Sequence, residues 1–313
     1  MGDKTGIEWT ESSWNPIVGC SIASPGCHHC YAAREAAGRL RNVPTYAGLA
    51  VRGTNGHAQF TGEIRCLPER LSQPYRWRRP RRIFVNSMSD LFHPDVPDGF
   101  IVRVLDVMYR CPEHTFQVLT KRPQRMAAFL RQWADRAGEP DGMPPMPHGP
   151  DAVRSVYTSG RAGLFAAMLD DMGDPPAGCA YPLYDWMEGP RFWPVSPCNG
   201  WWGTSVEADQ YTFRVHHLRD TPAAVRFVSA EPLLGPLPSL DLTGIDWVII
   251  GAESGPGARP MHPDWVRAII EKARMAGTAV FVKQLTGRAG RPAKDIGLFP
   301  PDLRIREYPK GPR

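Results

Sequence analysis

The segment "GCSIASPGCHHCYAAREA", residues 19–36, places Cys20, Cys27 and Cys30 within eleven positions and then continues into an alanine-rich stretch. Alanine is the strongest helix former, so a helix is predicted directly after the third cysteine. The preceding segment "WNPIVGC", residues 14–20, is a short apolar run and predicts the first strand. This part of the sequence therefore predicts a strand, a cysteine loop and a helix in succession, which is the start of a βα repeat.

Six further apolar runs follow, and each ends in small or polar residues, which is typical of strands buried on both faces. They lie at 82–90, 115–123, 200–207, 225–232, 246–254 and 279–284. Helical patterns lie between several of them, such as the one at 262–277. Strands that alternate with helices indicate parallel βαβ units, so about seven repeats predict an α/β fold that is a full or partial (β/α) barrel. In such a barrel the chemistry takes place at the carboxyl ends of the strands.

Residues 134–199 interrupt this alternation, because proline and glycine are too frequent there for regular elements. We expect residues 1–133 and 200–313 to form the barrel. Residues 134–199 are then an irregular insertion that acts as a lid or a substrate-binding arm. A disordered surface loop is the alternative interpretation of the same composition.

The overall composition is that of a soluble globular enzyme. The chain has 313 residues, of which 42% are hydrophobic and 22% are charged, and its formal net charge is +5. No apolar run reaches the roughly 20 residues that cross a bilayer, and the first residues do not read as a signal peptide. We therefore expect a cytoplasmic protein without a membrane partner.

The run "RWRRPRR" at 76–82 carries five arginines, a density that can neutralise phosphates. Trp77 lies among them and offers an aromatic ring on which a base can stack. Arg76, Trp77 and Arg78 are therefore candidates for binding a nucleic acid or a nucleotide. A solvated loop in front of a strand is the alternative interpretation.

The spacing of six and then two residues between Cys20, Cys27 and Cys30 is typical of metal ligands. Three thiolates can bind an iron–sulfur cluster and leave one iron open for a substrate or cofactor. A structural zinc ion needs four ligands, and free thiols are a third interpretation. The position after a strand, at the predicted catalytic edge, favours the open cluster. The fourth ligand of a zinc site would be His28, His29, His57 or His93.

Three cysteines in a loop after the first strand of an α/β barrel resemble the radical S-adenosylmethionine superfamily. More closely, the chain is similar over nearly its full length to a phage and prophage family of unknown biological role. The similarity lies in "TGIEWTESSWNPIVGCSIASPGCHHCYA", "FVNSMSDLFHPDVP", "LTKRP", "GTSVE", "SAEPLLGPL" and "GAESGPGARP". Two features depart from the superfamily pattern. Six residues instead of three separate the first two cysteines, and His29 stands where an aromatic residue usually precedes the third.

This resemblance implies a [4Fe–4S] cluster on the three cysteines, with S-adenosylmethionine bound to the fourth iron. It further implies a 5′-deoxyadenosyl radical that modifies or rearranges a substrate, and an electron donor such as flavodoxin or ferredoxin. The arginine run and the phage context favour a nucleobase, a nucleotide or a modified DNA base as substrate, in the host cytoplasm if a phage encodes the chain. The alternative from another class is a zinc-stabilised nucleic-acid-binding protein without catalysis.

The polar residues that follow the predicted strands are candidates for the remaining site. By similarity, Ser87 and Asp90 would bind the amino group of the cofactor's methionine, although Asp90 also fits a helix cap. Ser205 and Glu207 would bind its ribose and carboxylate, and the His29 ring would pack near adenine. Further candidates at strand ends are Ser229, Glu231 and Glu253 for the cofactor, and Lys121, Lys283 and Gln284 for the substrate. Either lysine could instead pair with a glutamate across the barrel.

Overall fold

The structure, a computed structural model, describes residues 5–54, 56–137, 199–255, 257–287 and 292–310. Its main feature is a sheet of eight strands. In chain order these are β1 (Ser12–Trp14), β6 (Arg82–Val85), β7 (Thr115–Thr120), β8 (Gly200–Ser205), β9 (Val225–Ala230), β10 (Trp247–Gly251), β11 (Ala279–Thr286) and β12 (Pro292–Ala293). Spatial neighbours follow the same order. All strands from β1 to β11 run parallel, and β12 pairs antiparallel with β11.

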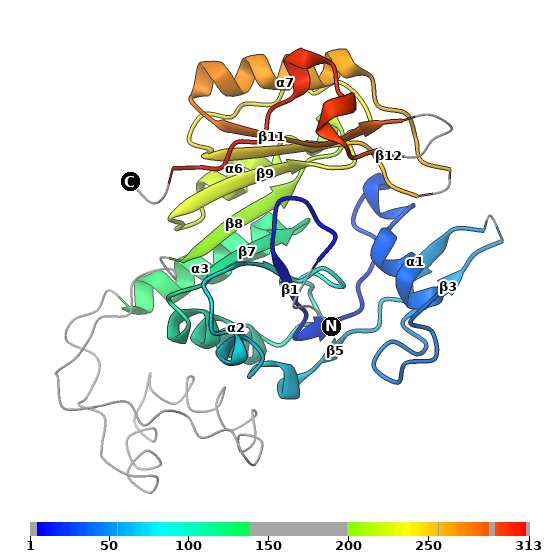
Figure 1. Cartoon of the computed structure of the whole chain (residues 1–313). Coiled ribbons are helices and arrows are strands. Elements are labelled where there is room, and N and C mark those ends of the chain that lie inside the picture. Colours follow the sequence, from blue (N-terminus) through cyan, green and yellow to red (C-terminus); the bar gives the residue numbers. More distant parts are fainter. Residues whose placement is uncertain (1–4, 55, 138–198, 256, 288–291, 311–313) are drawn as a thin grey trace, which may run out of the picture.

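Helices cover the sheet and connect most of its strands. They are α1 (Tyr31–Ala37), α2 (Asp98–Arg110), α3 (Pro123–Ala137), α6 (Arg214–Arg219) and α7 (Pro263–Ala276). Figure 1 shows α7 over β11, and α2 and α3 in the half of the molecule that carries β7. Across the described ranges, no helix combines the length and the apolar character that crossing a membrane requires.

Smaller elements complete the fold. Two antiparallel pairs lie outside the main sheet: β2 (Ile17–Val18) with β5 (Arg65–Cys66), and β3 (Ala50–Arg52) with β4 (Ala58–Phe60). The second pair packs against α1. Short 3-10 helices lie at Pro25–Cys27, Pro68–Arg70, Pro74–Arg76, Asp209–Tyr211, Ile296–Leu298 and Pro301–Leu303.

The predicted parallel α/β sheet is confirmed, since each of the six apolar runs after the cysteine loop contains one parallel strand. The connection between β9 and β10 holds no helix, so one repeat consists of strand and loop only. Closure into a barrel stays a prediction, because the hydrogen-bonded order of the described strands begins at β1 and ends at β12.

The prediction of a single first strand at 14–20 is wrong. The main-sheet strand β1 ends at Trp14, and Ile17–Val18 pairs antiparallel with β5 in a separate small sheet. Pro16 separates the two, because a proline has no backbone N–H to donate to a sheet ladder. The cysteine loop therefore follows β2, while the helix begins at Tyr31, as predicted.

The predicted insertion at 134–199 lies largely outside the described residues, which end at 137 and resume at 199. At its start, α3 continues to Ala137, so residues 134–137 are helical rather than irregular. At its end, the Asn199 amide donates to the carbonyls of Met108 and Cys111 at 2.9 and 3.0 Å, which ties the entry of β8 to the end of α2.

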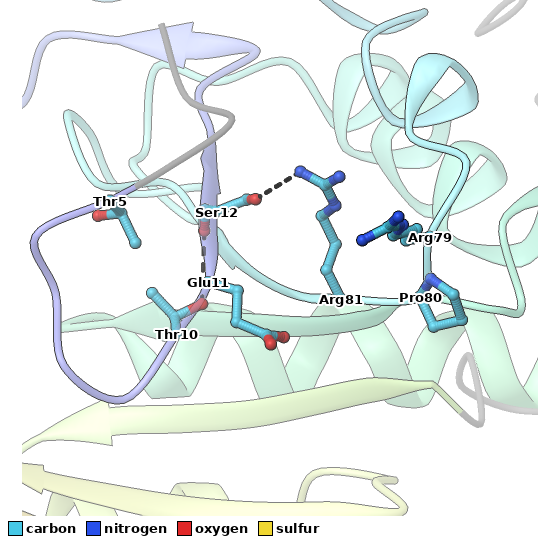
Figure 2. A pocket seen from close by; sticks show the side chains of 7 residues that line it. All are labelled: Thr5, Thr10, Glu11, Ser12, Arg79, Pro80 and Arg81. Carbon is cyan, nitrogen blue, oxygen red and sulfur yellow. Dashed lines mark hydrogen bonds between the residues drawn. The ribbon is translucent and has the colours of Figure 1, made fainter.

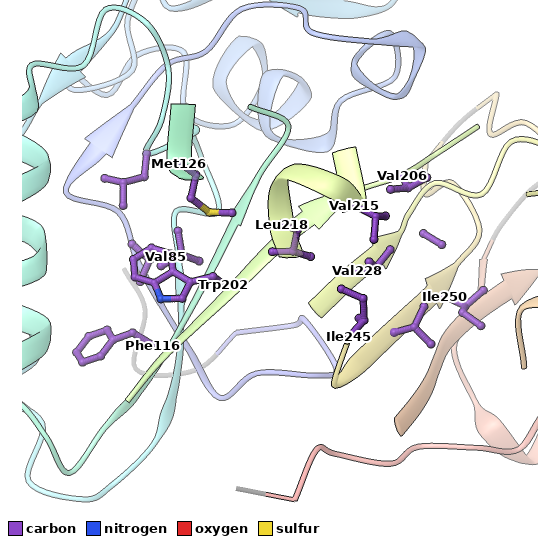
Figure 3. Packing of buried hydrophobic residues seen from close by; sticks show 14 of the residues in the cluster. Val85, Phe116, Met126, Trp202, Val206, Val215, Leu218, Val228, Ile245 and Ile250 are labelled. Atoms are coloured by element: carbon purple, nitrogen blue, oxygen red, sulfur yellow. The ribbon is translucent and has the colours of Figure 1, made fainter. Parts of the chain in front are cut away.

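The two faces of the sheet bury separate apolar clusters, because successive strand residues point to opposite faces. On the helix-covered face, Phe116, Trp202 and Val228 belong to the main cluster, part of which Figure 3 shows. On the other face, Phe227 and Trp247 pack in an aromatic cluster with Trp9, Phe84, Ile249 and Phe281. Full burial of one such side chain stabilises the fold by about 1.5–3 kcal/mol, so the strands are held rigidly from both sides.

Gly203, in β8, lies directly beneath the aromatic cluster. A Cβ atom at this position would meet ring atoms of Phe227 at 2.4–2.6 Å. Phe227 is fully buried, and its ring centroid lies 5.7 Å from that of Trp247, so it cannot move aside. The absence of a side chain at Gly203 is therefore a packing requirement of the sheet.

We predict that Gly203→Ala lowers the free energy of unfolding by about 1–3 kcal/mol, because it overpacks a rigid core. Urea unfolding monitored by tryptophan fluorescence measures this change. Gly235→Ala is the matched control, since an added Cβ there meets nothing within 4 Å. Equal stability of the two variants would contradict the packing argument.

Candidate functional site

The cysteine loop, residues 19–30, lies across the carboxyl ends of the parallel strands. Gly19 forms a parallel bridge with Ser89, which follows β6. Arg122, Glu207 and Glu253 follow β7, β8 and β10, and they meet other parts of the same loop. Because parallel strands present their carboxyl ends at one edge of the sheet, this edge brings distant parts of the sequence together.

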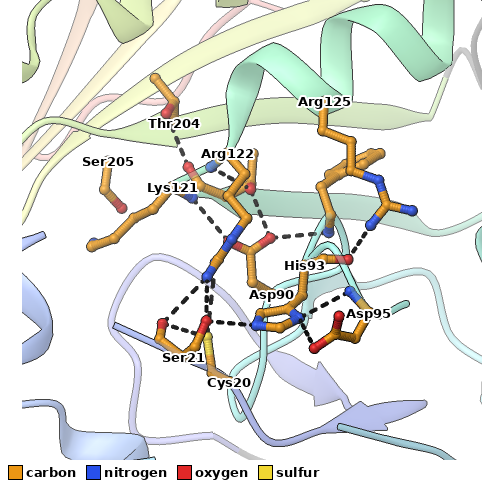
Figure 4. A network of polar contacts seen from close by, with 12 residues as sticks. Cys20, Ser21, Asp90, His93, Asp95, Lys121, Arg122, Arg125, Thr204 and Ser205 are labelled. Carbon is orange, nitrogen blue, oxygen red and sulfur yellow. Dashed lines mark hydrogen bonds and ion pairs between the residues drawn. The ribbon is translucent and has the colours of Figure 1, made fainter. Parts of the chain in front are cut away.

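The first half of the loop is held by Arg122, which follows β7 (Figure 4). Arg122 Nη2 donates to Ser21 Oγ at 2.9 Å and to the Ser21 carbonyl at 3.3 Å. Its Nη1 atom lies 2.9 Å from Asp90 Oδ2 and 3.9 Å from Cys20 Sγ. Burial alone would lower the pKa of Arg122, but the Asp90 carboxylate and Cys20 raise it, so the guanidinium stays charged.

Asp90 is 5% exposed and accepts four hydrogen bonds from the protein. They come from Thr120 Oγ1, Arg122 Nη1 and the backbone N–H groups of Phe92 and Lys121. The bond from Phe92 spans two residues and closes a local turn rather than capping a helix, since α2 begins only at Asp98. Both oxygens of the carboxylate are thus hydrogen-bonded to other groups of the protein.

His93 also holds the first half of the loop in place, through Ser21. Burial and the nearby Arg122 charge lower the pKa of His93, so its ring is neutral near pH 7. Its Nδ1 accepts from the Asp95 N–H at 3.3 Å, which leaves the proton on Nε2. Nε2 therefore donates to Ser21 Oγ at 2.6 Å, and Ser21 is fixed by two donors at once.

The second half of the loop meets Glu253, which follows β10. His29 Nδ1 lies 2.8 Å from Glu253 Oε2, and the His29 ring stacks on the ring of His57 at 3.9 Å between centroids. Arg259 binds Glu253 through its side chain and its backbone N–H, and also donates to the Pro25 carbonyl at 3.1 Å. Burial alone would raise the pKa of Glu253, but these bonds lower it below its ordinary value.

Glu207, which follows β8, is fully buried beside the same loop. Its Oε2 atom pairs with Arg214 at 3.0 Å, whereas Oε1 has no hydrogen-bond partner among the residues that the structure describes. A Cβ atom on Gly26 would lie 3.3 Å from Glu207 Cγ, so the loop backbone passes directly over this side chain. A buried carboxylate oxygen without a donor is costly, which marks this atom as a potential acceptor for a ligand.

The three thiols share one neighbourhood. Burial raises the pKa of the Cys20 thiol to about 12; the charges of Asp90, Cys30 and Cys27 act in the same direction, and the Arg122 charge opposes them. Burial also raises the pKa of the Cys30 thiol, and the nearby Cys27 acts in the same direction. In the part of the chain that the structure describes, no three His, Cys, Asp or Glu side chains are placed to hold a metal ion.

Other predicted cofactor residues lie at the same edge. Lys283 Nζ lies 2.8 Å from Glu231 Oε1, and Ser229 Oγ donates to Glu231 Oε2 at 3.3 Å. Ser205 is buried at the end of β8. Ser87 Oγ exchanges hydrogen bonds with the Asn15 amide.

The predicted substrate residues do not all lie together. Lys121 is near the site, since its charge lowers the pKa of the Cys30 thiol. Lys283 pairs with Glu231. The Gln284 amide is 2% exposed and donates to the Ala252 carbonyl at 2.6 Å. Gln284 therefore joins β11 to the end of β10, and its contact with a substrate stays a prediction.

The arginine run lies at the opposite edge of the sheet, because it precedes β6 whereas the cysteine loop lies at the carboxyl ends. Arg76 and Arg78 are exposed there. Trp77 is 8% exposed and belongs to the main core, and Arg81 already lies 5.0 Å above its ring. The burial of Trp77 is that of a core residue rather than of a surface on which a base stacks.

A pocket of about 400 Å³ lies beside this run (Figure 2). Arg81 Nη1 donates to Ser12 Oγ in its wall at 3.0 Å. Within the described residues, the exposed Arg78 and Arg79 side chains have no hydrogen-bond or ion-pair partner. The pocket is lined by Thr5, Thr10, Glu11, Ser12, Arg79, Pro80 and Arg81.

Sequence reasoning missed three arginines that shape the site. Arg122 lies at the end of the predicted run 115–123, in "LTKRP", and Arg259 lies five residues beyond the run 246–254, in "GARP". This position at the catalytic edge was the available signal. Arg214 follows its partner by seven residues, and nothing in the sequence marks that pairing. Asn86, a polar residue after β6, has both amide atoms buried and without a hydrogen-bond partner among the described residues.

We predict that Arg214→Met lowers the free energy of unfolding by about 3–5 kcal/mol, because it leaves the fully buried Glu207 charge unpaired. Adding Glu207→Gln removes that charge, so the double variant should regain most of the loss. Chemical denaturation measures both changes.

The control is Arg39→Met, which breaks an exposed pair with Glu35 on α1 and should change stability by less than about 0.5 kcal/mol. A similar small effect of Arg214→Met would show that Glu207 is not charged in the folded protein.

The sequence and the fold were compared with known proteins. No curated protein matches the chain. Spore photoproduct lyase complexed with dinucleoside spore photoproduct is 10% identical over 93% of this chain and 70% of that chain, with a TM-score of 0.38. A mutant of spore photoproduct lyase is 11% identical over 95% and 72%, with a TM-score of 0.39. Likenesses this weak do not establish a fold or an activity. The family model described as protein of unknown function (DUF5131) matches residues 4–295, and the chain therefore belongs to this family.

Proposed function

We propose that this chain is a radical S-adenosylmethionine enzyme with a partial (β/α) barrel. Cys20, Cys27 and Cys30 would hold a [4Fe–4S] cluster at the carboxyl edge of the sheet. The observation that carries the proposal is the placement of all three cysteines in one loop that crosses the carboxyl ends of the parallel strands. A similar set of thiols on a peripheral hairpin would favour a structural metal instead.

The residues present fit the implied groups in two respects. The thiols of a [4Fe–4S] cluster bind three different irons, so three neighbouring sulfurs suffice and need not converge on one ion. Glu207 Oε1 is a buried acceptor next to the loop, and it lacks a donor within the described part of the chain. A ribose hydroxyl is the kind of donor that such an oxygen lacks. When bound, the cluster and S-adenosylmethionine would supply a 5′-deoxyadenosyl radical.

The chain's own residues would orient these groups and exclude water. Glu207 Oε1 would accept from a ribose hydroxyl, while Oε2 stays paired with Arg214. His29, fixed by Glu253 and stacked on His57, offers a flat surface for the adenine. The backbone at Ser87 and the lysine–glutamate pair at Glu231 line the same edge and are further candidates for polar contacts.

For the substrate we propose a nucleic acid with a base to be modified or rearranged. The support is the arginine run, in which Arg78 and Arg79 are exposed and lack a protein partner in the described part of the chain. Because this run lies at the edge opposite to the cysteines, it would hold a sugar–phosphate backbone rather than the reacting base. A one-electron donor of the flavodoxin or ferredoxin type completes the proposed system.

We predict that anaerobic reconstitution loads about four irons per chain, with the brown absorption of an iron–sulfur cluster. Cys20→Ala, Cys27→Ala and Cys30→Ala should each abolish that absorption, because each removes one ligand. Iron analysis and visible spectroscopy measure the outcome.

Cys66→Ala is the matched control and should load normally, since Cys66 is a half-buried thiol in β5 outside the loop. Reduced holoenzyme incubated with S-adenosylmethionine should release 5′-deoxyadenosine. Stoichiometric zinc without iron would overturn the proposal and favour the zinc-stabilised nucleic-acid-binding protein.

We further predict that the double variant Arg78→Ala, Arg79→Ala binds DNA more weakly and with a shallower salt dependence. Each lost phosphate contact reduces the slope of log K against log [salt] by about 0.9 for duplex DNA. Fluorescence anisotropy at several salt concentrations measures both quantities. The control is Arg274→Ala, an exposed arginine on α7, which should leave the slope unchanged. An unchanged slope in the double variant would remove the run from the proposed interface.

A further inference from the structure

We propose that Arg122 is a positioning residue that raises the reduction potential of the cluster bound through Cys20. This inference rests on the proposed function and deepens it, because it assigns a role to a residue outside the cysteine motif. It concerns the ease with which the site accepts an electron, rather than the identity of the metal or of the substrate.

The geometry places a guanidinium against one thiol of the three. Arg122 Nη1 lies 3.9 Å from Cys20 Sγ, within the range of an N–H···S hydrogen bond. The Arg122 side chain is only 15% exposed, so water screens its charge weakly.

Arg122 is also prevented from turning away. Asp90 Oδ2 accepts from its Nη1 at 2.9 Å, while Ser21 accepts from its Nη2 through both Oγ and the carbonyl. Ser21 Oγ is itself held by His93. Both ends of the guanidinium are thus anchored, one on the sheet side and one on the cysteine loop.

Two other charged groups act on the same thiols and must be considered. Asp90 opposes Arg122, since its negative charge acts on Cys20 in the reverse direction. Lys121 acts on Cys30, at another corner of the set. Arg122 therefore has two effects: it donates to sulfur, and it offsets the Asp90 charge that would otherwise face Cys20 alone.

Reduction of the site adds one electron and makes it more negative. A nearby cation and a hydrogen bond to a ligand sulfur stabilise the more negative state, which raises the potential. In the test the electron comes from dithionite, a low-potential reductant that is oxidised as the site is reduced. No bond forms or breaks in this step, and no proton is transferred.

The experiment is a redox titration of the reconstituted full-length chain with dithionite, followed by electron paramagnetic resonance. Arg122→Gln should lower the ratio of reduced to oxidised sites about tenfold at a fixed potential, which is 59 mV for a one-electron couple. Arg122→Lys should shift it less, because the charge remains. The double variant Asp90→Asn, Arg122→Gln should return toward the wild-type potential, because both opposing charges are gone.

The matched control is Arg259→Gln. Arg259 also ties the cysteine loop to the sheet, through Pro25 and Glu253, but it makes no contact with Cys20 or Cys30. A shift in this variant as large as in Arg122→Gln would indicate general loosening of the loop and overturn the inference.

The outcomes separate this inference from the proposed function. If the wild-type chain takes up no iron, both the proposed function and the role of Arg122 are overturned. A chain that loads iron normally, but whose potential is the same with Arg122→Gln, overturns only the role of Arg122. If none of the Arg122 variants loads iron although the wild type does, Arg122 acts in assembly and the inference is also overturned.

Discussion

A charge that is buried at the end of a strand must find an opposite charge, and this constraint shapes the carboxyl edge of the sheet. Each of the buried carboxylates here has an arginine, because an unpaired charge would cost several kcal/mol. Two of the arginines continue into the cysteine loop, at Ser21 and at the Pro25 carbonyl, so the loop is positioned by pairs that the fold needs in any case. The pairs are Asp90 with Arg122, Glu207 with Arg214, and Glu253 with Arg259.

The strands that carry these groups are fixed from both sides, whereas the loop is held mainly by polar contacts. Aromatic rings around Trp247 fill one face of the sheet, and helices cover the other. The loop, by contrast, buries little apolar surface of its own, apart from Cys30 against the small cluster around Ala32. Its position therefore depends on hydrogen bonds and ion pairs. A bound cofactor would have to keep or replace them, because a buried polar group that loses its partner is costly.

Most of the fold could be predicted from the sequence, because strands buried on both faces give continuous apolar runs that need no tertiary information. The first strand could not be predicted correctly, because the chain passes from one sheet to another at Pro16 and the hydrophobic pattern does not show this change. The site was only partly predictable. The cysteines and the strand-end glutamates are visible as motifs, but the arginines that pair with them are chosen by geometry. For Trp77 the sequence motif was misleading, because an aromatic residue within a basic run suggests an exposed ring, whereas Trp77 is buried in the fold.

The arginine run and the cysteine loop lie on opposite edges of the sheet, which sets a size threshold for ligands. β7 has six residues, so the two edges are roughly 20 Å apart at about 3.3 Å per residue. A free nucleotide is too short to reach both edges. A duplex would need roughly six base pairs at about 3.4 Å per step to span the same distance. If both edges contact one molecule, that molecule is a polymer. The chain would then distinguish a nucleic-acid strand from a free nucleotide by length alone.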